Sequence, residues 1–380
     1  MIIAFVSLMK VFPWGGSEEL WYRTAKLALA NGHTVSTLTQ RWEIHPEKIN
    51  ELNSLGANTE FYFKPQYSIG ERAAIKFKFK NNVLEVIPDI NADVFVVSNG
   101  STWDFVQHYP LAEYIIRQGK PYIIINQHSY ESGNILAGPS RENAIQFMHN
   151  ARRIFFVATR NIDAAERQVA YHIPNTQIIS NPININNLAI KAFPNSTQLS
   201  MACVARLDCD YKGQDILLQA LSAEHWVARD FHLTFYGAGP HLSHIQLLIT
   251  LYQLQDKVSI AGHVRDVDSI WDANQVLVLP SLSEGMPLAL VEAMLSGRTA
   301  LATDVGDNNR YIIDGQTGFL VATASVKSLA GGLERLWNNR ASLQTMGEHA
   351  FKHACAITDL HPEQILLNFI ELIEPDNNIK

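Results

Sequence analysis

Short apolar segments alternate with longer amphipathic segments along most of the chain, and this alternation limits the possible fold more than any other feature. Short apolar runs predict buried strands, whereas apolar residues three and four positions apart predict helices. The first cycle reads as a strand over residues 2–8, a helix over 18–31 that stops at Gly32, and a strand over 33–39. Repeated strand–helix–strand units predict the α/β class with a parallel, doubly wound sheet.

The alternation is interrupted once and then restarts. Residues 181–198 are rich in Asn and Pro and have no clear period, which is typical of a linker. We therefore expect a Rossmann-like domain over 1–182, a second one over 183–360, and a C-terminal helix within 361–380 that packs back on the first domain. Ligands of open parallel sheets bind at the carboxyl ends of strands, so a cleft between the domains is the expected site. The remaining predicted strands cover 93–98, 122–126, 154–159, 177–179, 199–204, 232–236, 258–261, 275–279 and 299–303, and the remaining helices cover 214–221, 241–254, 288–296 and 362–372.

The composition excludes several classes of protein. A formal net charge of -7 argues against a nucleic-acid binder, which needs a basic face. The 3 cysteines are too few and too scattered for a disulfide framework or a zinc site, and they favour a reducing compartment. The apolar N-terminus lacks a basic leader and a cleavage site, so it predicts a strand rather than a signal peptide. No apolar run approaches the roughly 18 residues of a membrane span. A cytoplasmic protein is expected, with peripheral contact at the inner face of a membrane left open.

The segment Ser283–Glu292, S-E-G-M-P-L-A-L-V-E, places two carboxylates around the expected start of a helix. Pro287 suits the first helical position, because the N–H that it lacks would have no partner there. The unpaired N–H groups of the first turn and the helix dipole form a site for a phosphate or diphosphate, and Gly285 lets a ligand approach the backbone. Carboxylates accept hydrogen bonds from sugar hydroxyls, so Glu284 and Glu292 would hold a hexose and a ribose on either side of a diphosphate. On the residues alone, a solvated helix position for Glu292 is an equal alternative.

A resemblance to a known family favours the nucleoside diphosphate sugar. The stretch P-S-x-x-E-G-x-P-L-x-x-x-E-A-M over 280–294 resembles the E-x7-E motif of family 4 glycosyltransferases, which are retaining enzymes of the two-domain GT-B type. The resemblance covers nearly the whole chain, and it implies an acceptor-binding first domain and a second domain that binds the nucleotide sugar. The other matching segments, in the family's order, are G-G-S-E at 15–18, A-L-A-N-G-H-T-V at 28–35, I-I-S-N-P-I-N at 178–184, V-A-R-L-D-C-D-Y-K-G at 204–213, Y-G-A-G-P at 236–240, A-G-H-V at 261–264 and D-G-Q-T-G-F-L-V at 314–321.

The resemblance also implies roles for single residues. Arg206 and Lys212 would stabilise the charge that grows on the leaving diphosphate, with a surface ion pair as the alternative. Glu284 and His128 would act at the sugar, although His128 is also compatible with a loop histidine without a role. Glu18 would at least complement a helix dipole. The expected donor-binding residues are Gly15, Gly16, Gly237, Val264, Gly285, Met286, Pro287, Leu288 and Glu292, with ordinary turn glycines as the alternative reading of Gly15, Gly16 and Gly237.

No metal and no other cofactor is expected. Residues 208–210 and 266–268 match the D-x-D pattern of metal-dependent glycosyltransferases, but cations and helix termini already supply positive charge at the predicted site. The segment 237–239 lacks the third glycine of a dinucleotide-binding motif, because Leu242 stands in its place. One departure from the family pattern is V-G-D-N-N-R, which puts Asp307 and Arg310 where a glycine pair and a glutamate are common. This change affects the expected identity of the sugar rather than the fold.

The predicted function is the retaining transfer of a hexose-type sugar from a nucleoside diphosphate to a hydroxyl acceptor, a glycan or a lipid-linked intermediate. Two alternatives stay open: an epimerase or hydrolase of the same fold, and a non-catalytic binder of nucleotide sugars. A basic and aromatic cluster in the first half would contact anionic lipid or an acidic acceptor, although a solvated surface is the favoured reading. This cluster consists of Arg72, Lys76, Lys78 and Lys80.

Overall fold

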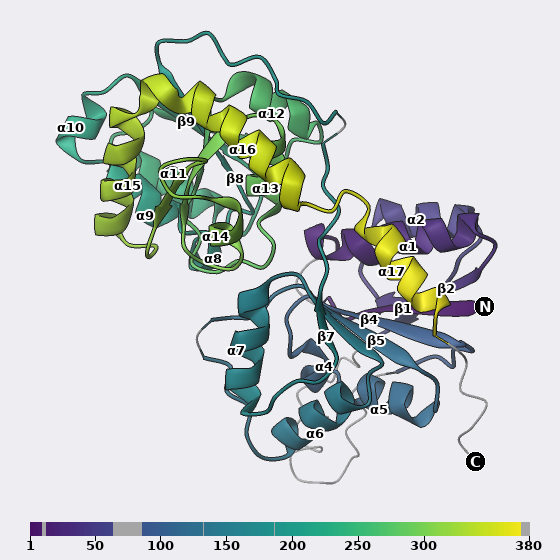
Figure 1. Ribbon diagram of the computed structural model, residues 1–380. Helices are drawn as coiled ribbons and strands as arrows, with labels where there is room; N and C mark the ends of the chain where they lie inside the picture. Colours follow the sequence, from purple (N-terminus) through teal and green to yellow (C-terminus); the bar gives the residue numbers. More distant parts are fainter. Residues whose placement is uncertain (10–12, 64–85, 132, 186, 374–380) are drawn as a thin grey trace. The chain divides into compact units, whose positions relative to one another are not determined.

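The computed structural model describes the whole chain except residues 10–12, 64–85, 132, 186 and 374–380 (Figure 1). The chain divides into two compact units, Met1–Pro182 with His361–Lys380, and Ile183–Leu360. The basic cluster at residues 72–80 lies outside the described residues. Among the described helices, none has the length and hydropathy needed to span a bilayer.

The first unit is built on a seven-stranded sheet with the order β3-β2-β1-β4-β5-β6-β7. All pairings between neighbouring strands of this sheet are parallel. The central strands are runs of Ile, Val and Phe that are buried on both faces, as expected where helices cover both sides of a parallel sheet. The strands are β1 (Ile2–Ser7), β2 (Thr34–Gln40), β3 (Asn58–Tyr62), β4 (Val94–Asn99), β5 (Tyr122–Asn126), β6 (Arg153–Phe156) and β7 (Thr176–Ile178).

The C-terminal helix belongs to the first unit, although it follows the whole second unit in sequence. Leu366, Leu367 and Ile370 of this helix share one apolar cluster with Leu20 and Trp21, and Figure 1 shows α17 beside α1. The helices of the unit are η1 (Gly16–Glu18), α1 (Glu19–Ala30), α2 (Glu47–Ser54), α4 (Asp104–Gln107), α5 (Tyr109–Arg117), α6 (Gly138–His149), α7 (Thr159–Val169) and α17 (Pro362–Glu371).

The second unit has a six-stranded parallel sheet with the order β10-β9-β8-β11-β12-β13. Its strands are β8 (Leu199–Val204), β9 (Phe231–Tyr236), β10 (Val258–Gly262), β11 (Val276–Leu279), β12 (Thr299–Thr303) and β13 (Phe319–Val321). Its helices are α8 (Cys209–Lys212), α9 (Gln214–Leu221), α10 (Glu224–Val227), α11 (Leu242–Leu251), α12 (Val267–Ala273), α13 (Leu288–Leu295), α14 (Asn308–Tyr311), α15 (Val326–Asn338), η2 (Arg340–Ser342) and α16 (Leu343–Ile357).

Two Rossmann-like parallel sheets confirm the predicted α/β class. The strands predicted over 122–126, 199–204 and 299–303 have those bounds in the structure. The strand predicted over 154–159 is wrong at its end, because β6 stops at Phe156 and Thr159 already begins α7. The helix predicted over 241–254 is shorter at both ends. Strands β3 and β13 were not predicted, because one is half polar and the other has only 3 residues.

Candidate active site

The loop between β11 and α13 forms the centre of the candidate site in the second unit. The strand ends before Pro280, and α13 begins at Leu288 with Pro287 as its N-cap residue. Pro287 donates no backbone hydrogen bond, but its carbonyl accepts the N–H groups of Leu290 and Val291 and so starts the helix. The hydroxyl of Thr303, at the end of β12, donates to the carbonyl of Ser281 at 2.6 Å and so fixes the start of this loop.

Glu284 and Lys212 form an ion pair directly before α13. The Nζ of Lys212 lies 2.7 Å from Oε1 of Glu284, and the Ser281 hydroxyl donates to the same oxygen at 2.6 Å. The Glu284 side chain is only 10% exposed and the Lys212 side chain 23%. The lysine and the glutamate were expected at different parts of the donor, and the structure places them in direct contact.

Gly213 explains how Lys212 reaches this loop. Its φ of +62° ends α8 in the left-handed conformation that glycine adopts without strain. A Cβ at this position would lie 2.2 Å from the carbonyl oxygen of Pro280, so only glycine allows the two loops to touch. The contact is reinforced because the carbonyl of Tyr211 accepts the N–H of Leu282 at 2.9 Å. The dipeptide K-G therefore positions a cation against the start of α13.

Arg206 lies in the loop after β8, where its guanidinium is 3.4 Å from Oδ2 of Asp208. Two turn glycines close this loop: a Cβ on Gly237 would lie 2.0 Å from the carbonyl oxygen of Ala205, and one on Gly239 would lie 2.3 Å from that of Leu207. The backbone of the 237–239 turn therefore packs directly on the Arg206 loop. Glycine is required at both positions because any side chain would overlap the neighbouring backbone, whereas an ordinary turn glycine needs only an unusual φ.

Val264 lies in the turn that follows β10, next to the same backbone. The N–H of Gly237 donates to the carbonyl of Gly262 at 2.7 Å, which joins the turns after β9 and β10. Val264 is half-buried there. The structure thus gathers the turns that carry Gly237 and Val264 at the carboxyl ends of adjacent strands, where parallel sheets bind ligands.

Glu292 is buried, with 4% of its surface exposed, so the alternative of a solvated helix side chain is wrong. Its Oε1 accepts a hydrogen bond from the backbone N–H of Asn184 at 3.0 Å and from Nδ2 of the same residue at 3.1 Å. The sequence did not identify Asn184 as a partner, because 108 positions separate it from Glu292. A ribose at Glu292 would share the carboxylate with this asparagine.

The segment V-G-D-N-N-R over 305–310, which departs from the family pattern, packs against the loop that carries Glu284. Gly306 has a φ of +53°, and a Cβ there would lie 2.6 Å from the carbonyl oxygen of Gly285. The backbone N–H of Asp307 donates to that same carbonyl at 3.3 Å, and the Asp307 side chain is buried beside Arg310. Gly306 and Asp307 therefore contact the backbone of the Glu284 loop and help to hold its conformation, and the sequence pattern did not reveal this role.

His128 follows β5 in the first unit and is fixed by its backbone. Its carbonyl accepts hydrogen bonds from the N–H and the hydroxyl of Thr102 at 2.9 and 3.0 Å. Its half-buried ring meets the ring of Tyr130 edge-on at 4.6 Å between centroids. The position at the carboxyl end of a central strand is compatible with contact to a ligand.

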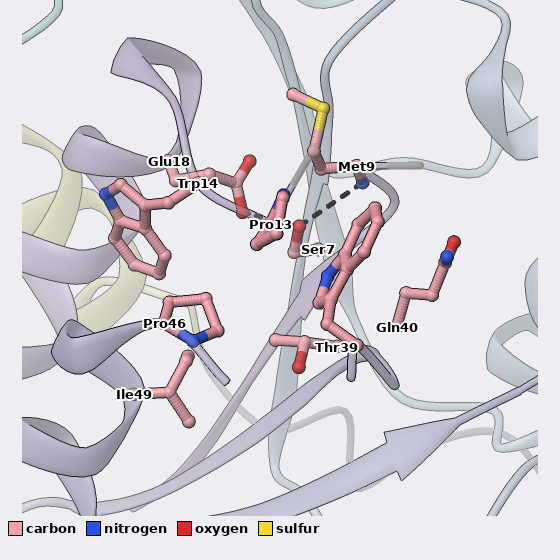
Figure 2. Close-up of a pocket in the computed structure, with 10 residues that line it drawn as sticks. Ser7, Met9, Pro13, Trp14, Glu18, Thr39, Gln40, Pro46 and Ile49 are labelled. Atoms are coloured by element: carbon pink, nitrogen blue, oxygen red, sulfur yellow. Dashed lines mark hydrogen bonds between the residues drawn. The ribbon is translucent and has the colours of Figure 1, made fainter. Parts of the chain in front are cut away.

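The glycine pair does not open α1 directly. Gly15 is extended, Gly16 begins the short helix η1, and α1 starts only at Glu19. Glu18 is the N-cap residue of α1, and it is buried: the residue is 2% exposed, and its carboxyl group accepts hydrogen bonds from Ser7 (Figure 2) and Trp21. Burial raises the pKa of Glu18 to about 7, and the charges of Asp104 and Glu19 act in the same direction against the two hydrogen bonds.

Asp208, Asp210 and His241 form the one group of potential metal ligands in the described part of the chain whose ligand atoms lie within 4.8 Å of one another. Their other contacts suit a metal poorly. The Nδ1 of His241 accepts the backbone N–H of Cys209 at 2.9 Å, and the Arg206 guanidinium beside Asp208 would repel a cation.

Known proteins are similar to this chain both in the second unit alone and over most of its length. Residues 198–339 match the family model described as Glycosyl transferases group 1. The chain is 24% identical over 335 residues to the lipopolysaccharide glucosyltransferase WaaG of Escherichia coli, and the match covers 85% of each protein. It is 34% identical over 122 residues to the exopolysaccharide phosphotransferase SCO2592 of Streptomyces coelicolor, but there it spans only 13% of that protein.

Among solved structures, the chain is similar to Alr3699/HepE of Anabaena in complex with UDP and glucose. The TM-score is 0.73 at 17% identity, and the match covers 98% of this chain and 99% of that one. A likeness at this identity establishes the fold. The family match therefore places the second unit among the group 1 glycosyltransferases, and the two parallel sheets with this structural likeness give the chain the GT-B fold.

Proposed function

We propose that the chain transfers a hexose from a UDP-sugar to a hydroxyl group of a glycan or lipid-linked acceptor, with retention of configuration and without a metal ion. The observation that carries this proposal is the Lys212–Glu284 ion pair directly before α13. A sugar diphosphate needs a cation for its phosphates and a carboxylate that accepts hydrogen bonds from its hydroxyls, and this loop offers both. UDP and glucose bound to the similar Anabaena protein support the choice of base and sugar.

The proposed reaction breaks the bond between the anomeric carbon and the β-phosphate oxygen. The acceptor oxygen forms its bond to the same face of that carbon, and the proton of the acceptor hydroxyl passes to the departing phosphate oxygen. Arg206 and Lys212 stabilise the negative charge that accumulates on the diphosphate, and this charge is largest in the transition state. The stereochemistry rests on the resemblance to family 4 enzymes.

The remaining residues bind and orient the donor in this proposal. Gly285, Met286, Pro287 and Leu288 present the start of α13 to the diphosphate, while Glu292 holds the ribose hydroxyls. The turns with Gly237 and Val264 face the base. The first unit supplies the acceptor site, with His128 near the sugar and the Gly15–Gly16 turn at the phosphates.

Calorimetric titration with UDP and an assay of UDP release from UDP-glucose test the proposal. We expect UDP to bind, UDP to be released slowly in water, and EDTA to leave the rate unchanged. Binding without any release would favour the non-catalytic binder, and conversion of the sugar without release of UDP would favour an epimerase. No binding of UDP, UDP-glucose or other nucleotide sugars would refute the proposed function.

A further inference from the structure

The two oxygens of the Glu284 carboxyl group have different surroundings. Oε1 accepts two hydrogen bonds, one from Nζ of Lys212 at 2.7 Å and one from the Ser281 hydroxyl at 2.6 Å. Oε2 makes no hydrogen bond with a described residue, and it is not one of the buried side-chain atoms that lack a partner, so it retains contact with solvent. Because each oxygen of an ionised carboxylate offers about two lone pairs, Oε1 is fully used and Oε2 is left for a ligand.

Ser281 is held firmly where it meets Glu284. The residue is fully buried, and its carbonyl accepts the Thr303 hydroxyl at 2.6 Å. Thr303 is also fully buried, and its own carbonyl accepts Nδ2 of the buried Asn308 at 2.7 Å. Three successive hydrogen bonds therefore connect Asn308 to the Glu284 carboxylate through buried residues. This connection fixes the Ser281 hydroxyl before a donor binds.

Lys212 is the less constant of the two partners of Oε1. Its side chain is 23% exposed, and the proposed function directs its charge to the diphosphate. An ammonium group has three N–H donors and can divide them among several acceptors, whereas a serine hydroxyl has one O–H donor. The single donor of Ser281 is committed to Oε1. Ser281 therefore keeps the carboxylate oriented when the lysine turns to the phosphates.

The occupied oxygen limits how Glu284 can bind a sugar. A carboxylate with two free oxygens binds a pair of neighbouring hydroxyls best, with one hydroxyl on each oxygen. The contacts of Lys212 and Ser281 on Oε1 prevent this arrangement. We therefore expect Glu284 to accept a hydrogen bond from one hydroxyl, through Oε2.

We infer that Ser281 is a positioning residue for the donor sugar, because its hydroxyl occupies Oε1 of Glu284 and leaves Oε2 to accept a single hydroxyl of the hexose. Ser281 does not contact the sugar in this arrangement and acts only through Glu284. The inference rests on the proposed function, and it adds how the site distinguishes one hydroxyl of the donor sugar from the others.

Calorimetric titration of the full chain with UDP-glucose and with its 2-, 3-, 4- and 6-deoxy forms tests this inference. Ser281→Ala is expected to bind UDP-glucose about tenfold more weakly, since the carboxylate is then free to turn away from the sugar. All but one of the deoxy forms should be weakened by the same factor. The form that lacks the hydroxyl bound by Glu284 should bind the variant and the unchanged protein equally, because the effect of Ser281 passes through that hydroxyl alone.

The matched control is Ser296→Ala. Ser296 is as fully buried as Ser281 and belongs to the same unit, but its hydroxyl has no hydrogen-bond partner among the described residues. This control should change none of the affinities. If Ser281→Ala fails to fold, Ser281→Cys replaces it with the same expected results, because a thiol is only a weak donor.

The inference is wrong if Ser281→Ala weakens every donor by the same factor, since that is the result of a merely structural role. It is also wrong if the variant weakens no donor, or if two deoxy forms each abolish its effect, because Glu284 would then bind a pair of hydroxyls. UDP, which has no sugar, should bind all of these proteins equally. UDP binding with a failed deoxy series overturns only this inference, whereas an unchanged protein that binds neither UDP nor nucleotide sugars refutes the proposed function.

Discussion

Replacing Lys212 by methionine removes one charge from the candidate site and keeps the apolar stem of the side chain. In the structure, Glu284 would then keep only the Ser281 hydroxyl on its buried Oε1. A hydrogen bond to a charged group contributes about 1.5–3 kcal/mol, and the partial exposure of Lys212 places the loss of stability at about 1–3 kcal/mol. For a unit of this size, each kcal/mol lowers Tm by about 2–4 °C, so we expect a decrease of about 2–12 °C.

The same variant is expected to lose catalysis for a separate reason. A fixed positive group at a developing oxyanion is worth about 100- to 1000-fold in kcat, so Lys212→Met should lower the rate of UDP release by that factor. The double variant Lys212→Met/Glu284→Gln should recover most of the lost Tm, because no carboxylate is left without its cation, but it should recover none of the turnover. Calorimetry and a UDP-release assay measure the two effects. Turnover within threefold of the unchanged protein in Lys212→Met would refute the role of the cation.

Three further outcomes follow from the packing. Gly213→Ala is expected to destabilise the second unit by more than about 1 kcal/mol, since the new Cβ would lie 2.2 Å from the Pro280 carbonyl oxygen. The control Gly331→Ala should be neutral or stabilising, because its Cβ would meet nothing within 4 Å. Equal Tm values for the two variants would contradict the Gly213 contact. Arg298 is fully buried and donates to 6 backbone carbonyls, so Arg298→Met should lower the free energy of unfolding by at least about 2 kcal/mol, and an unchanged urea midpoint would contradict this. The pKa of Glu18 rises from 4.5 to about 7 on folding, with Asp104 and Glu19 facing it, so the folded state holds the extra proton and stability falls as pH rises through this window. Relative to the unchanged protein, Glu18→Gln should therefore gain up to about 3 kcal/mol between pH 4.5 and 8, and a pH-independent difference would rule out the raised pKa.

Much of the fold follows from local patterns that the sequence displays directly. Strands β5, β8 and β12 are apolar runs with clear ends, and α9 has apolar residues at helical spacing after Gly213. Glycine and proline mark where these elements stop. The start of α13 after Pro287 was predicted for the same reason, since proline at a helix start is a local preference.

The contacts of the candidate site could not be predicted from local patterns. Lys212 and Glu284 are 72 positions apart, and they meet because Gly213 packs on the Pro280 carbonyl and Leu282 donates to the Tyr211 carbonyl. Likewise, nothing next to Glu292 in the sequence indicates that Asn184 covers it. The burial of Glu18 depends on Ser7 and Trp21, which donate hydrogen bonds to its carboxyl group from 11 and 3 positions away, and nothing in the G-G-S-E segment indicates these partners.

Comparing UDP with UMP by calorimetric titration tests the central claim most directly, since the two ligands differ only in the phosphate assigned to Arg206 and Lys212. The unchanged protein should bind UDP at least tenfold more tightly than UMP. The double variant Arg206→Met/Lys212→Met should bind the two nucleotides equally, with UMP affinity unchanged. If the double variant still prefers UDP by the original factor, these two cations do not bind the diphosphate and the account of the site is wrong.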